Sequence, residues 1–300
     1  MGFQTGPASA KDRLGLGLFV LIAFGLAWPV QVGIALFGRQ AAAPALTGIL
    51  VLPLAFLLMW PPALGAYVAR RWVEKSGFGD AGLRWPPLKC VLLAWFGPAL
   101  LTLVTVALSL PVYPPDTELA ALHSLLAAAG GPPLPAEAVL LAQVAAGLTV
   151  AVPVNSLFAF GEEFGWRGYL LPRLMGLWGP WPGILAHGAV WGLWHAPLVF
   201  LASYSYPGHP PPYLPGVFLF TAFCILLGVN LAWLRLSSGS VVPPTVAHGA
   251  LNAVGGLPLF LLKDVDPATA GPLWSPVGWA ALGLTAALLY SVRNPLKPGA

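Results

Sequence analysis

The segment AVLLAQVAAGLTVAVPVNSLFAFGEEFGWR, residues 138–167, is an apolar stretch long enough to cross a bilayer, and it ends in two adjacent glutamates. An acidic side chain in the middle of a membrane helix costs about 2.5–3.5 kcal/mol on insertion scales. Because of this cost, carboxylates in such segments usually serve a function. Glu162 and Glu163 are therefore the first candidate functional residues.

The composition of the whole chain predicts an all-α polytopic membrane protein. The 300 residues are 58% hydrophobic and 8% charged, against about 25% charged residues in soluble domains, and the mean hydropathy is +0.80. The net charge is +4, but the basic residues are spread over many loops, so we expect no nucleic-acid partner. Cys90 and Cys224 lie in apolar segments without CxxC spacing, which predicts neither a disulfide framework nor a zinc knuckle.

Hydropathy predicts about eight transmembrane helices. Residues 1–13 would form a cytoplasmic N-terminal segment, 14–293 an integral membrane domain with its core motifs in 155–255, and 294–300 a cytoplasmic tail. Lys11 and Arg13 precede a first apolar segment that is long enough to span, so we interpret it as a retained helix and not as a signal peptide. The expected spans are residues 14–37, 44–69, 90–110, 138–162, 182–203, 215–235, 241–262 and 273–292.

The distribution of charge predicts the orientation. With both termini cytoplasmic, the outer connections contain only two basic residues, Arg39 and Lys263, and all the other Lys and Arg residues are cytoplasmic. This bias agrees with the positive-inside rule. Residues 111–137 form a long outer connection, in which Leu119–Ala129 is expected to form a short interfacial helix.

Strongly polar residues are rare inside the expected spans, and most of them fall on three spans. His248 and Asn252 are four residues apart and share one helix face, and Glu163 precedes Arg167 by four, the favourable order for an ion pair. Contacts between helices are the expected role of Asn155, Asn230 and His187, and His209 is expected to be solvated in an outer loop. The polar residues within the spans are Asn155, Glu162, Glu163, His187, His195, Asn230, His248 and Asn252.

These residue types are typical of hydrolysis by an activated water. A buried glutamate beside a histidine can act as a general base, and a histidine and an amide one turn apart can donate hydrogen bonds to an oxyanion. No GxSxG-type nucleophile is present. Two alternatives stay open: a zinc ion held by Glu162, His195 and His248, although HExxH is absent, or a structural ion pair of Glu162 with Arg167 or Arg173.

Three motifs together resemble the CPBP family, which includes the type II CAAX prenyl endopeptidases and relatives linked to bacteriocin processing and immunity. The sequence EEFGWR at 162–167 matches EExxxR, WGLWH at 191–195 matches FxxxH with tryptophan for phenylalanine, and HGALN at 248–252 matches HxxxN. Each motif is weak alone. Their order, on separate predicted spans, is specific.

The resemblance implies an intramembrane endopeptidase without a cofactor. It implies that Glu162 activates water together with His195, and that His248 and Asn252 form the oxyanion hole. Glu163, Arg167 and Trp191 would support the site. The implied substrate is a peptide or a lipidated protein, with a prenylated cysteine near its C-terminus, and the implied location is a prokaryotic plasma membrane with the active site toward the cytoplasm. A transporter or an immunity-type binding protein is the alternative.

Overall fold

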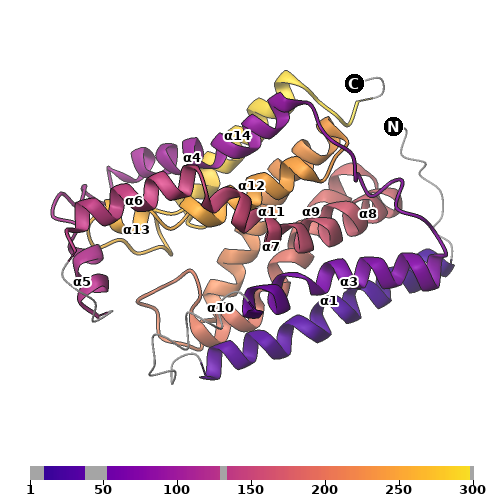
Figure 1. Cartoon of the computed structure of the whole chain (residues 1–300), viewed down its shortest axis with the longest axis horizontal. Coiled ribbons are helices and arrows are strands. Elements are labelled where there is room, and N and C mark those ends of the chain that lie inside the picture. The colour runs from indigo at the N-terminus through magenta and orange to yellow at the C-terminus, as the bar shows by residue number, and fades with distance from the viewer. Residues whose placement is uncertain (1–9, 38–52, 129–133, 298–300) are drawn as a thin grey trace.

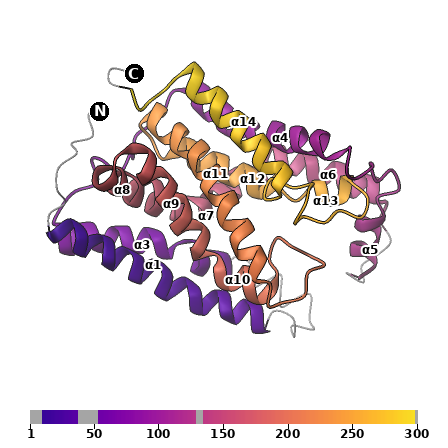
Figure 2. The same cartoon turned by 180° about the vertical axis from the view of Figure 1, so that it is seen from behind.

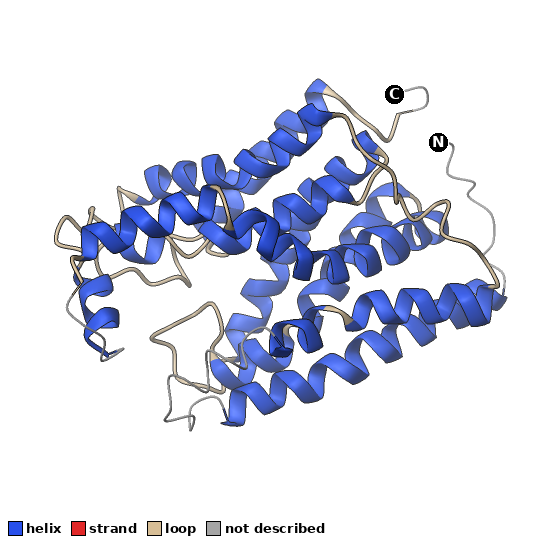
Figure 3. Ribbon diagram, in the orientation of Figure 1, coloured by secondary structure: helices blue, strands red, loops and turns tan. Residues whose placement is uncertain are grey.

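The computed structural model describes residues 10–37, 53–128 and 134–297, and every regular element in these ranges is a helix (Figures 1 and 3). Two of the elements, η1 and η2, are π-helical. The helices in chain order are α1 (Ala10–Phe37), α3 (Pro61–Val68), η1 (Ala69–Glu74), α4 (Leu88–Ser109), α5 (Ala120–Ala128), α6 (Ala136–Leu148), α7 (Ala151–Gly165), η2 (Trp166–Leu170), α8 (Leu171–Trp178), α9 (Pro180–Trp194), α10 (Ala196–Ala202), α11 (Leu214–Ser238), α12 (Val242–Val254), α13 (Pro258–Leu261) and α14 (Pro276–Val292).

Within the described residues, three helices are long and apolar enough to cross a membrane, namely α1, α4 and α11. Two bent pairs raise the number to five if each pair forms one span: α6 with α7–α8, bent by 55°, and α9 with α10, bent by 43°. The all-α, multi-span class is therefore confirmed. Part of the expected second span, residues 44–52, lies outside the described residues.

Two of the expected spans, 138–162 and 182–203, are each interrupted by a bend. The first segment breaks between α6 and α7, and the second breaks at His195. A proline lies in the first turn after each break, Pro153 in α7 and Pro197 in α10. Because proline has no N–H and its ring crowds the preceding turn, it disfavours an uninterrupted helix at that point. The short helix predicted within Leu119–Ala129 is confirmed as α5, Ala120–Ala128.

Helix α11 lies at the centre of the bundle. In its most apolar stretch 67% of the residues are buried, against 28% in α1 and 22% in α4. Figure 2 shows α11 between α9 and α14, and both helices contact it. The contact with α9 needs glycine, because a Cβ at Gly188 would lie 2.5 Å from the Cα of Ile225. This close approach fixes how α9 presents its polar residues to the interior.

A cluster of ion pairs joins η1 to η2 and α8 beyond the apolar segments. Glu74 accepts hydrogen bonds from the Tyr169 hydroxyl at 2.6 Å and from the Nε and Nη2 atoms of Arg173. Arg70 donates to Asp80 Oδ1 at 2.6 Å. Burial has the largest effect on Glu74 and raises its pKa, but the hydrogen bonds from Arg173 and Tyr169 and the charge of Arg173 together lower the pKa below its ordinary value. This cluster fixes the chain directly after the glutamate motif.

Candidate active site

The two glutamates at the end of α7 are both buried but have different partners. Glu163 is 0% exposed, and its Oε1 accepts from Arg167 Nη1 at 2.7 Å and from His248 Nδ1 at 2.9 Å. Glu162 is 2% exposed, and its Oε2 accepts from the indole Nε1 of Trp191 at 2.8 Å and of Trp166 at 3.3 Å. Glu163 thus has an arginine and a histidine as partners, whereas Glu162 is held by two neutral indole donors.

The expected ion pair between Glu163 and Arg167 is present and fully buried. The alternative ion pair of Glu162 is not present, because Arg167 pairs with Glu163 and Arg173 pairs with Glu74. The two glutamates point in different directions because neighbouring residues of a helix are about 100° apart. The structure therefore gives the two carboxylates different environments.

The π-helix η2 carries Arg167, and arginines from two other elements support its backbone. Arg70 Nη2 donates to the carbonyl of Gly168 at 2.9 Å, and Arg235 Nε donates to the carbonyl of Arg167 at 3.2 Å. The guanidinium of Arg167 lies over the ring of Trp191, 4.1 Å from its centroid, an arrangement that favours a cation. Local π-helical turns are frequent at functional sites.

Trp191 connects the groups on α7, α9 and α12. Its indole donates to Glu162, and its backbone carbonyl accepts from His195 Nδ1 at 2.9 Å. Its ring makes edge contacts with the rings of His195 and His248, with centroid distances of 5.9 and 5.5 Å. Trp191 therefore positions Glu162 and both histidines relative to one another.

His195 stands at the break between α9 and α10. Because a carbonyl can only accept, Nδ1 of His195 must carry the proton in its bond to Trp191 O. Nε2 of the neutral ring then has a free lone pair. Trp194 and Phe220 pack against the ring at centroid distances of 4.8 and 4.9 Å, so the ring orientation is fixed on several sides.

His248 and Asn252 come from α12. Gly249 lies between them in the sequence and allows α12 to approach α7, because a Cβ there would lie 2.7 Å from the backbone N of Ser156. Asn155 Nδ2 donates to Gly249 O at 3.2 Å across the same interface, which is a contact between helices. His248 is buried, whereas Asn252 is exposed.

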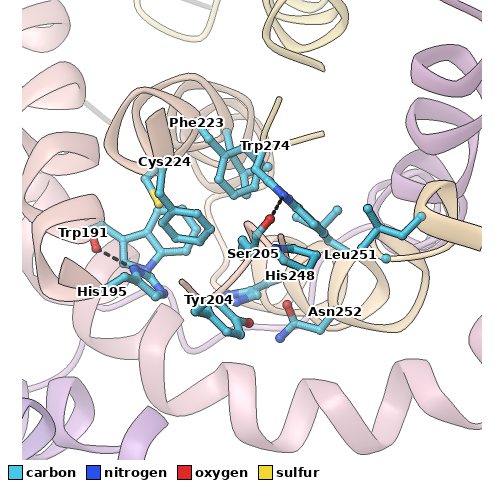
Figure 4. Close-up of a pocket in the computed structure, with 16 residues that line it drawn as sticks. Trp191, His195, Tyr204, Ser205, Phe223, Cys224, His248, Leu251, Asn252 and Trp274 are labelled. Atoms are coloured by element: carbon cyan, nitrogen blue, oxygen red, sulfur yellow. Dashed lines mark hydrogen bonds between the residues drawn. The ribbon is translucent and has the colours of Figure 1, made fainter. Parts of the chain in front are cut away.

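A cavity of about 500 Å³ lies beside these residues, and Trp191, His195, His248 and Asn252 line it. Figure 4 shows His248 and Asn252 on α12 and His195 elsewhere on the wall. Glu162 is not part of the lining and reaches the wall through the indole of Trp191. The remaining wall is mostly apolar and aromatic: Tyr204, Ser205, Pro207, Phe220, Phe223, Cys224, Leu227, Leu251, Gly255, Gly256, Leu259 and Trp274.

Much of this apolar wall was not predicted from the sequence. Tyr204, Ser205 and Pro207 belong to the loop that follows α10, and Trp274 precedes α14; Trp274 Nε1 donates to Ser205 O at 2.6 Å. The aromatic content of the loop was a signal, but its position over the cavity depends on tertiary contacts. His209 in the same loop is partly exposed, as expected for a loop histidine, and its Nε2 also lies 2.8 Å from Asp266 Oδ1.

Within the described ranges, no group of three or more His, Cys, Asp and Glu residues is arranged to hold a metal ion. Glu162, His195 and His248 therefore do not form a preorganised ligand set in this conformation. His187 is fully buried on α9 and does not line the cavity.

Two comparisons with known proteins found matches to part of this chain. Residues 140–254 match the family described as type II CAAX prenyl endopeptidase Rce1-like. The chain is also 30% identical over 120 residues to the CAAX prenyl protease 2 of Methanococcus maripaludis, an alignment that covers 39% of this chain and 44% of that protein. The chain thus spans less than half the length of this relative. The family match covers the part that carries the three motifs, and the two matches together confirm the resemblance read from the sequence.

Proposed function

We propose that this protein, whose central part resembles the type II CAAX prenyl endopeptidases, is an intramembrane endopeptidase that cleaves a membrane-associated substrate by an activated water. One observation carries the proposal. Glu162, His195 and His248 come from three helices, and Trp191 contacts all three beside one cavity. A purely structural set of polar residues would not need a cavity of this size next to it.

The first step of the proposed reaction is attack by water. Glu162 takes a proton from a water molecule through Oε1, since Oε2 is held by the two indoles, and the oxygen of that water bonds to the carbonyl carbon of the substrate. His195 orients the same water through the lone pair on Nε2, because its Nδ1 proton is fixed on the Trp191 carbonyl. General-base assistance of this kind contributes about 10²–10⁴-fold in rate.

The developing oxyanion is placed between His248 and Asn252. Asn252 donates through its amide, and His248 donates through Nε2 when the ring carries both protons. With both glutamates ionised and Arg167 protonated, the buried groups sum to one negative charge, which a protonated His248 neutralises. The tetrahedral intermediate then breaks its C–N bond, and the proton held by Glu162 passes to the leaving amine.

The shape and chemistry of the cavity favour a substrate with an apolar group. Aromatic and aliphatic side chains form most of its wall, as in sites for lipid-like ligands. We assign to it a prenylated cysteine near a protein C-terminus, with the last three residues removed as the leaving peptide. The relative in Methanococcus maripaludis is named as a CAAX prenyl protease, which supports this substrate class.

The proposal includes the arrangement in the membrane. It places eight spans in a prokaryotic plasma membrane, both termini in the cytoplasm and the active site toward the cytoplasmic side. The basic residues around the glutamate motif, Arg70, Arg173 and Arg235, support a cytoplasmic position for this end. The wall formed by Tyr204 and Pro207 comes from a loop assigned to the outside, so the cavity extends away from that end.

The experiment is cleavage of a fluorogenic C-terminal peptide, prenylated or not, by the purified protein. We expect faster cleavage of the prenylated peptide and loss of cleavage in Glu162→Ala and His195→Ala. A strong chelator is expected to leave the rate unchanged. Loss of activity with chelator that zinc restores would assign Glu162, His195 and His248 to a metal instead. Failure to cleave any peptide would favour the non-enzymatic transporter or immunity-type binding protein.

A further inference from the structure

The break between α9 and α10 leaves two backbone groups without their helical partners. In a continuous helix the N–H of Leu198 would donate to the carbonyl of Trp194, four residues earlier. The helix bends by 43° at this point, and His195 stands at the bend, as the end of α9 and the start of α10. These two groups must find other partners, since an unpaired buried backbone group is costly.

Gln31 of α1 supplies both partners with one side chain. Its Nε2 donates to Trp194 O at 2.8 Å, and its Oε1 accepts from Leu198 N at 3.2 Å. The primary amide of Gln31 is thus inserted into the missing hydrogen bond of the bent helix. Gln31 is 1% exposed, so water does not compete for these bonds.

Two further contacts fix the same point to α1. Trp28 Nε1 also donates to Trp194 O, at 3.1 Å, and Trp194 Nε1 donates back to the carbonyl of Ala23 at 2.9 Å. The Trp194 side chain packs against the His195 ring. Helix α1 therefore determines the geometry of Trp194, the residue directly before His195. Helix α1 itself lies outside residues 140–254, the part that matches the family.

We infer that Gln31 is a positioning residue that holds the α9–α10 bend and thereby directs His195 into the cavity. The inference rests on the proposed function for its effect on catalysis. A displacement of about 1 Å at a catalytic group can reduce a rate by about 100-fold. The substitution Gln31→Met keeps the length and apolar volume of the side chain and removes both hydrogen bonds.

The kinetic test compares Gln31→Met with wild type and with Gln143→Met, the same change at an exposed glutamine of α6. We expect kcat to fall by about 100-fold in Gln31→Met with KM changed by less than about twofold, and Gln143→Met to behave like wild type. In the His195→Ala background, Gln31→Met should cause no further loss. A loss of similar size in that background would show a general structural role and would overturn the inference.

A second measurement does not depend on activity. The chain has five histidines, and ring resonances of isotope-labelled histidine can be assigned by substitution. We expect Gln31→Met to shift the resonances of His195 and to leave those of His209 and His123 in place, which also shows that the fold is intact. An unchanged His195 resonance would overturn the inference. A wild-type protein without peptidase activity would remove the proposed function, while this resonance would still decide the role of Gln31.

Discussion

Glu163 and Glu162 are neighbours, yet the proposed mechanism gives Glu163 only a supporting role, and the change Glu163→Gln tests this. The carboxylate of Glu163 contacts Arg167 and His248, and Glu163 and Arg167 are both fully buried. Removing its charge takes away the carboxylate that pairs directly with the buried guanidinium. Breaking one member of a buried pair costs about 3–5 kcal/mol.

This cost has a measurable size. At about 1.4 kcal/mol for each factor of ten, the folding equilibrium should change by roughly 140- to 3,700-fold. Thermal unfolding in detergent should shift downward by roughly 6–20 °C. The matched control is Asp266→Asn, which breaks the partly exposed pair with His209 and should cost about 1 kcal/mol or less.

A double substitution separates burial of a lone charge from loss of packing. Glu163→Gln with Arg167→Met removes both charges and should regain at least half of the lost stability, because no unpaired ion stays buried. If Glu163→Gln is no more destabilising than Asp266→Asn, or if the double variant is less stable than the single one, Glu163 does not support the site in this way.

Other outcomes follow from the packing and from the ion-pair cluster. Gly188→Ala places a methyl group against the backbone of Ile225 and should lower the stability by about 1–3 kcal/mol, whereas Gly25→Ala, with open space around it, should not; equal unfolding temperatures would contradict the close α9–α11 contact. Because the pKa of Glu74 is lowered in the folded protein, its pairing with Arg173 stabilises the fold above about pH 4.5. This stabilisation is lost as the pH falls through the lowered pKa. Below about pH 4.5 the unfolding temperature of wild type should therefore fall more steeply than that of Glu74→Gln. Parallel curves of unfolding temperature against pH would contradict the stabilising role of the Glu74–Arg173 pair.

The sequence predicted the features that depend on local spacing. Four residues separate Glu163 from Arg167, and the helix places them on one face, where they pair. The same spacing places His248 and Asn252 on one wall of the cavity. The short helix at 120–128 was also visible, because an apolar segment of that length cannot span a bilayer.

The features that depend on how helices rotate and bend were not predicted. The bond from Trp191 to Glu162 needs the relative rotation of α7 and α9, which hydropathy does not contain. Pro197 indicates a helix irregularity, but the bend at His195 is fixed by Gln31, which is distant in the sequence. Similarly, the placement of Tyr204 at the cavity depends on the contacts of the loop after α10.

The central claim is that Glu162 is the base, and the most direct test is the cleavage rate of Glu162→Gln. The amide keeps an oxygen that can accept from Trp191 and Trp166, so the unfolding temperature should stay within a few degrees of wild type. It cannot take a proton from water, so kcat should fall by about 10²–10⁴-fold. A Glu162→Gln variant that folds normally and cleaves the prenylated peptide at the wild-type rate would contradict the account.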